Sequence, residues 1–264
     1  MPPAGGPEIL NTRKGCGSMT MFADRDSYRF QEKKESQKAA SPPTGLGYAL
    51  PGDEGEGSPD TYFNPDISLE FLSRLWIRGE YLESDSRAVA IVGSRACSNE
   101  GAQDAYELST ELVQSDVCIV SGLALGIDGF AHRAALKAGG RTIAVLGTGL
   151  DHIRPVRHRS LYKEILTSGA GVSPFPPRFT GYSDGRNYLQ RNTVIAGLSR
   201  VLVVADARAR SGSLSAARSA LRQGRPVGIM ASLLRSQSWA ESFCQQPGVF
   251  VVNSVADVLE RLGS

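Results

Sequence analysis

Four short segments rich in glycine, hydroxyl side chains and arginine are the residues of this chain best suited to hold phosphate oxygens. They are Gly93-Ser94-Arg95, Ser121-Gly122, the pair Gly147 and Gly149, and Arg210-Ser211-Gly212-Ser213. Glycine lets backbone N–H groups approach an anion closely, and the N-terminus of a helix adds partial positive charge. Arginine supplies a planar fork of donors that matches a phosphate group. We therefore expect these segments to bind a phosphate-bearing ligand.

The distribution of charge favours a polyanionic partner, although the whole chain of 264 residues carries a net charge of only +2. The first 88 residues hold 10 basic and 14 acidic side chains, a net charge of −4. Residues 141–235 hold 15 basic and 4 acidic side chains, a net charge of +11, and 14 of the 15 are arginines. Such a concentration of arginine indicates a nucleic acid or a nucleotide as the partner. A solvated basic surface without a ligand is the alternative.

Candidates for catalysis or metal binding are few. Asp128 follows a glycine at a predicted helix start and His132 lies one turn later, so we interpret both as structural turn residues. Asp206 follows a predicted strand, but no neighbouring residue in the sequence would orient it as a base. The four cysteines form no CxxC pair and there are only three histidines, which argues against a zinc site. With no G-x-G-x-x-G and no P-loop lysine, we expect no cofactor, no metal and no enzymatic activity.

Short apolar runs alternate with helical patterns from residue 89 onward. The runs are Val89–Val92, Val117–Val120, Thr142–Leu146, Val201–Ala205, Val227–Met230 and Val249–Val252. The predicted helices cover residues 102–114, 128–138, 213–223 and 255–262. Uncharged, β-branched runs of this length are typical of strands buried on both faces. The sequence thus predicts an α/β fold, an extended Rossmann-like, doubly wound and mainly parallel sheet with helices on both faces.

Two segments are expected along the chain. Residues 1–66 are rich in proline, glycine, serine and charge, and we predict a disordered, low-complexity tail with a short helix around residues 28–37. Residues 67–264 are predicted to form the Rossmann-like domain, led by a short helix near residues 69–75 and an extended piece through Trp76 and Ile77. No apolar run is long enough to span a membrane and no secretory signal is evident, so we expect a cytoplasmic protein.

Six motifs in order along the chain resemble the DprA/Smf family of DNA-processing proteins. The motifs are Val89-Ala-Ile-Val-Gly-Ser-Arg95, Ser121-Gly-Leu-Ala-Leu-Gly-Ile-Asp128, Ala144-Val-Leu-Gly-Thr-Gly-Leu-Asp151, Phe175-Pro-Pro177, Arg191-Asn192 and Arg210-Ser-Gly-Ser-Leu214. The resemblance covers residues 74–232. It implies a Rossmann-like fold that binds single-stranded DNA in a basic pocket, forms a homodimer and loads the RecA recombinase in natural transformation, without acting as an enzyme.

The resemblance also assigns residues to the DNA-binding pocket. It carries the anion site of the family over to Arg191 and Asn192, in addition to glycines, serines and arginines of the four segments above. Where the family has Pro-Arg-Arg-Asn-Arg, this chain has Leu189-Gln-Arg-Asn-Thr193, so two basic positions are absent. The N-terminal helical domain and the C-terminal winged helix of many members are expected to be absent as well.

Two other functions stay open from the sequence. The first is a nucleotide sensor or a phosphoribohydrolase of the LOG type, although the turn at Arg210 lacks the glutamate of that family's Pro-Gly-Gly-x-Gly-Thr-x-x-Glu motif. The second is a degenerate scaffold that keeps the fold with weak DNA binding. Four aromatic residues are candidates for stacking on bases, with ordinary packing as the alternative. They are Phe175, Phe179, Tyr182 and Tyr188.

Overall fold

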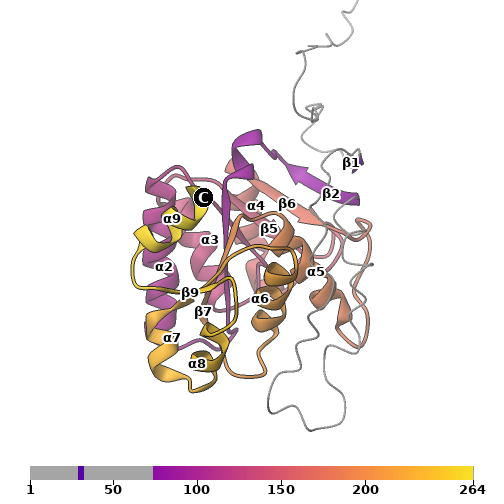
Figure 1. Ribbon diagram of the computed structural model, residues 1–264. Helices are drawn as coiled ribbons and strands as arrows, with labels where there is room; N and C mark the ends of the chain where they lie inside the picture. The colour runs from indigo at the N-terminus through magenta and orange to yellow at the C-terminus, as the bar shows by residue number, and fades with distance from the viewer. Residues whose placement is uncertain (1–28, 33–73, 264) are drawn as a thin grey trace, which may run out of the picture.

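The computed structural model describes residues 29–32 and 74–263, which form one α/β sheet structure (Figure 1). Within these residues a nine-stranded sheet has the order β1-β2-β6-β5-β4-β3-β7-β8-β9. The pairs from β6 to β9 are parallel, whereas β2 is antiparallel to β6 and β1 is antiparallel to β2. The strands are β1 Arg29–Glu32, β2 Arg74–Gly79, β3 Ala88–Gly93, β4 Cys118–Ser121, β5 Thr142–Val145, β6 Ala170–Ser173, β7 Val201–Asp206, β8 Val227–Met230 and β9 Val249–Val252.

Helices cover both faces of the sheet. They are α2 Asn99–Gln114, α3 Ile127–Lys137, α4 Arg159–Ser168, α5 Arg186–Gly197, α6 Gly212–Arg222, α7 Ala231–Ser236, α8 Trp239–Cys244 and α9 Val255–Gly263. Along β3, Val89 and Ile91 face the core under α2, α3 and α9, while Ala90 and Val92 face the core under α5 and α6. Because both faces are covered, β3 is apolar at nearly every position, as buried parallel strands are. No helix in the described ranges is long and apolar enough to cross a membrane.

The fold class is the predicted one, and all six predicted strands and four predicted helices are present with small differences at their ends. The structure adds β6, which none of the six apolar runs includes, and the helices α4, α5, α7 and α8. A helix was predicted around residues 28–37, and this is wrong for residues 29–32, which form β1. Of the helix predicted near residues 69–75 only Arg74 and Leu75 are described, and both lie in β2, as does the predicted extended piece through Trp76 and Ile77. The predicted tail and the boundary at residues 66 and 67 otherwise lie outside the described residues.

The strand order changes direction between β3 and β7. From β3 the chain moves outward through β4 and β5 to β6, and then returns to add β7 on the other side of β3. At such a switch point the loops after the two central strands diverge to opposite faces, which leaves a crevice at the carboxyl ends of the strands. Gly93-Ser94-Arg95 lies at the end of β3 and Arg208–Ser213 follows β7, so two predicted phosphate-binding turns flank this crevice.

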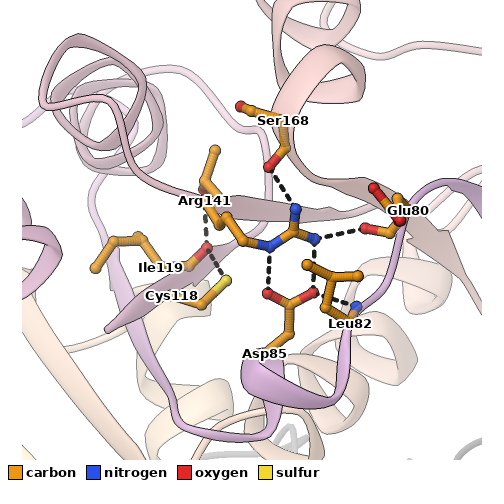
Figure 2. A network of polar contacts seen from close by, with 8 residues as sticks. Glu80, Leu82, Asp85, Cys118, Ile119, Arg141 and Ser168 are labelled. Carbon is orange, nitrogen blue, oxygen red and sulfur yellow. Dashed lines mark hydrogen bonds and ion pairs between the residues drawn. The ribbon is translucent and has the colours of Figure 1, made fainter. Parts of the chain in front are cut away.

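A buried ion pair holds the lead-in segment at the opposite end of the sheet (Figure 2). Asp85, which is 0% exposed, accepts hydrogen bonds from Nε and Nη2 of Arg141 at 2.7 and 2.8 Å. The same guanidinium donates to the carbonyl oxygens of Ser168 and Glu80 at 2.9 and 2.7 Å, and the Leu82 N–H donates to Asp85 at 2.7 Å. The bidentate contact thus joins the segment after β2 to the residue before β5 and to the end of α4.

Candidate functional site

A pocket of about 520 Å³ lies at the carboxyl ends of β3 and β7, against α5 and the start of α6. Nine of the thirteen residues predicted to bind phosphate line it: Gly93, Ser94, Arg95, Arg191, Asn192, Arg210, Ser211, Gly212 and Ser213. Arg208 lines the pocket as well. The side chains of Arg95, Arg208 and Arg210 are exposed, and none of the three forms an ion pair with a described residue. The pocket therefore carries unpaired positive charge.

The turn after β3 forms one wall of the pocket. Gly93 is required there because a Cβ would lie 2.5 Å from Ile127 and 2.7 Å from the carbonyl oxygen of Asp206. The Ser94 N–H donates to that same carbonyl oxygen at 2.7 Å, so it is not available to an anion. The wall is thus held by backbone contacts to β7, and the exposed Arg95 side chain follows it in the pocket lining.

The start of α6 forms the opposite wall. The Ser211 hydroxyl caps the helix by accepting from the Ser213 N–H at 3.3 Å, as serine commonly does at this position. A Cβ at Gly212 would meet no atom within 4 Å, so the backbone of this residue faces open space. The Asn192 side-chain amide donates to the Gly212 carbonyl oxygen at 3.0 Å and to Ser215 Oγ at 2.6 Å. Asn192 therefore fixes the position of the turn that presents α6 to the pocket.

Arg191 lies at the base of the pocket and is only 6% exposed. Its Nη1 donates to the carbonyl oxygens of Gly122 and Val145, the latter at 2.8 Å, and its Nε donates to Asn192 Oδ1 at 3.1 Å. Burial lowers the pKa of Arg191, and the nearby Asp128 carboxylate acts in the opposite direction. Much of the donor capacity of this arginine is thus used within the protein, in contrast to the exposed Arg95.

Asp128 is a buried acidic residue of the pocket lining whose carboxylate interacts electrostatically with Arg191. Its Oδ2 accepts from the N–H groups of Gly122 and Ala124 at 3.2 and 3.3 Å, which closes the turn between β4 and α3. Burial raises the pKa of this carboxyl, while Arg191 and the two N–H groups act to lower it. These contacts agree with the predicted structural role of Asp128 in the turn.

Tyr188 lies between two arginines on the pocket wall. Its ring centroid is 5.6 Å from the Arg95 guanidinium carbon and 5.8 Å from that of Arg191. A Cβ at Gly147 would lie 2.6 Å from the same ring, so the glycine makes room for the tyrosine. The arrangement gives the pocket an aromatic surface beside its charges.

The remaining four predicted residues do not line the pocket. Ser121 is buried and its hydroxyl donates to the Ile91 carbonyl oxygen at 2.6 Å. Gly122 contacts Arg191 and Asp128 through its backbone, and the Gly147 carbonyl oxygen accepts from the Asn187 amide at 2.7 Å. The Gly149 N–H donates to the Phe179 carbonyl oxygen at 2.8 Å. The structure thus gives these four residues contacts that support the walls.

His132 is buried in the core and lies outside the pocket lining. Its Nδ1 is 2.7 Å from Thr142 Oγ1, and the threonine hydroxyl donates to the Ile119 carbonyl oxygen at 2.8 Å. Because the threonine proton is already donated to Ile119, the hydroxyl oxygen can only accept from His132. The neutral imidazole therefore carries its proton on Nδ1. Burial, assisted by the nearby His158, Arg133 and Arg191, lowers the pKa of His132 to about 3. The predicted structural role therefore agrees with these contacts.

Several pocket residues were absent from the predicted site. Arg208 precedes Arg210 in the same turn, so its place after β7 was the available signal. Tyr188 was among the four aromatic candidates for stacking. The apolar lining residues Ala124, Leu189 and Ile195 carry no distinguishing signal in the sequence. Asp206, considered as a base, accepts instead from the N–H and hydroxyl of Ser98 at 3.0 and 2.8 Å, at the start of α2.

Comparisons with known proteins agree with this geometry. Residues 70–263 match the family model described as DNA recombination-mediator protein A. The chain is 38% identical to Protein Smf of Escherichia coli over 208 residues, which is 77% of this chain and 55% of that protein. It is 42% identical to the DNA processing protein DprA of Streptococcus pneumoniae over 65% of this chain and 60% of that protein. The chain thus spans between half and two thirds of the length of these two relatives.

Two solved structures are similar to nearly three quarters of this chain. DNA processing protein A from Streptococcus pneumoniae has a TM-score of 0.64 at 37% identity, covering 73% of this chain and 69% of that one. DNA processing protein A from Helicobacter pylori, described for its single-stranded DNA binding mode, has a TM-score of 0.64 at 26% identity. That match covers 72% of this chain and 87% of the other.

Proposed function

This chain belongs to the DNA recombination-mediator protein A family, and on that premise we propose that its pocket binds single-stranded DNA. The observation that carries the proposal is the pocket at the switch point, in which Arg95, Arg208 and Arg210 are exposed and unpaired among the described residues. Phosphate groups of a nucleic-acid strand are the ligands that best match such a set of arginines. The Tyr188 ring adds a surface on which a base can stack.

We further propose that the protein acts as a recombination mediator that protects single strands and helps load RecA during DNA uptake. This role is supported by the relatives named DNA processing protein, and it includes a homodimer and a cytoplasmic site of action. Binding without chemistry is the mode of action we favour, because Asp206 at the rim is engaged by Ser98 and Asp128 is engaged by backbone N–H groups.

Titration of a labelled oligonucleotide tests the binding step. The protein is expected to bind a single-stranded oligothymidylate more tightly than a duplex of the same length, and Arg95→Gln should weaken binding. Arg200→Gln is the matched control, since Arg200 is exposed but precedes β7 at the opposite end of the sheet. Equal binding by wild type and Arg95→Gln, or no binding at low salt, contradicts the proposal. A second assay compares RecA filament assembly on single strands with and without the protein.

A further inference from the structure

Tyr182 is the exposed member of an aromatic cluster beside the pocket. The ring of Phe175, which is buried, stacks on that of Phe179 with centroids 4.5 Å apart. The Tyr182 ring stands edge-on to both, at 6.2 Å and 87° from Phe175 and at 4.9 Å and 69° from Phe179. Tyr182 is 39% exposed, so the two phenylalanines form a base that holds a tyrosine ring at the surface.

An arginine lies over this exposed ring. The guanidinium carbon of Arg186 is 4.3 Å from the Tyr182 ring centroid, a closer approach than either arginine makes to Tyr188. Arg186 also contacts Asp184 at 3.6 Å, but both side chains are more than half exposed, so this ion pair is weak. Nucleobases of any sequence stack on aromatic rings and on arginine guanidinium groups, and this site offers one of each.

One hydrogen-bonded residue ties this cluster to the pocket. Asn187 accepts from the Tyr182 N–H through Oδ1 at 3.2 Å, and its amide donates to the Gly147 carbonyl oxygen at 2.7 Å. The next residue is Tyr188, whose ring lies against Gly147 in the pocket wall. The segment from Tyr182 to Tyr188 thus presents two tyrosines, each with arginine over its ring, from a backbone fixed to the end of β5.

We propose that Tyr182 and Arg186 form a second base-stacking subsite, which holds a nucleobase of the same strand outside the pocket. The inference rests on the proposed function and deepens it, because it assigns a site to nucleotides that the pocket itself does not hold. Phe175 and Phe179 act as structural support for this subsite and do not contact the strand.

The test compares oligothymidylates of increasing length on the full chain by fluorescence anisotropy. Tyr182→Ala should bind the shortest oligomers as wild type does and longer ones at least about 5-fold more weakly, the loss expected for one stacked base. Tyr182→Phe should restore the wild-type affinity, because the ring is kept. Phe130→Ala is a matched control, since Phe130 is also 39% exposed but lies on α3 without an arginine over its ring among the described contacts.

A second measurement separates stacking from packing. The oligomers used are long and carry one abasic site, which is placed at each position in turn. At one position the missing base should weaken binding to wild type, whereas the same oligomer should bind Tyr182→Ala no more weakly than the intact oligomer does. If Tyr182→Ala binds every length as wild type does, whether or not it melts earlier, the subsite is refuted while the pocket stands. If wild type binds no single strand at low salt, the proposed function and the subsite both fail.

Discussion

Replacing Arg191 should mainly lower the stability of the fold, because its side chain is buried and bonded within the protein. The guanidinium is buried, donates to the carbonyl oxygens of Gly122 and Val145, and interacts electrostatically with the buried Asp128 carboxylate. Arg191→Met leaves two buried carbonyl groups and one buried carboxyl without this partner. Each buried polar group that is left without its hydrogen bond costs about 1–3 kcal/mol, and the sum is a large part of the stability of a typical domain. With two buried carbonyl oxygens losing their donor, we expect the free energy of unfolding to fall by about 3 kcal/mol.

Urea denaturation at pH 7 measures this loss, with an unchanged m-value as the sign that only stability has changed. Arg95→Met is the matched control, because Arg95 is exposed and its loss should change the free energy of unfolding by less than about 0.5 kcal/mol. Adding Asp128→Asn to Arg191→Met should cost less than the sum of the two single changes, since the two residues interact. A loss below about 1 kcal/mol for Arg191→Met would refute the structural role of this arginine.

Three further predictions concern stability and the shape of the pocket. In the unfolded chain His132 takes up a proton below about pH 6.5, whereas in the folded chain its pKa is about 3 and it stays neutral. The free energy of unfolding should therefore fall by about 2 kcal/mol from pH 7 to pH 5, and His132→Gln should remove this part of the pH dependence. Asp85→Asn should cost about 3 kcal/mol in a thermal melt by leaving Arg141 without its carboxylate, while oligonucleotide binding at the other end of the sheet stays the same. Gly147→Ala should displace the Tyr188 ring and weaken oligonucleotide binding, with a packing cost of about 1–3 kcal/mol in the same melt; unchanged binding would contradict the role of that ring.

The parallel core was predictable because its strands must be apolar on both faces. Runs such as Val201–Ala205 stand out against the polar helices around them. The strand β6 did not stand out, because Ala170, Gly171 and Ser173 are small or polar and lie buried through neighbouring side chains, such as Tyr162 against Gly171. The edge strand β1 has a helix-like composition and is placed only by pairing with β2, which is a long-range contact.

The site was predictable where a turn follows a central strand. The residues after β3 and β7 fall at the switch point, so the rule for ligand sites in such sheets locates them. The turns after β4 and β5 have the same residue types but lie beside the crevice, where Ser121 and Gly147 serve packing. Residue type alone cannot separate these two outcomes, because it does not specify which turns face the crevice.

The most direct test of the central claim is the salt dependence of single-strand binding. If Arg95, Arg208 and Arg210 each contact one phosphate, the plot of log affinity against log salt should have a slope of about −2, since each contact on a single strand contributes about −0.7. Replacing all three by glutamine should bring this slope close to zero, and replacing Arg95 alone should make it shallower by about 0.7. An unchanged slope and affinity in the triple variant would contradict the assignment of the pocket as the DNA-binding site.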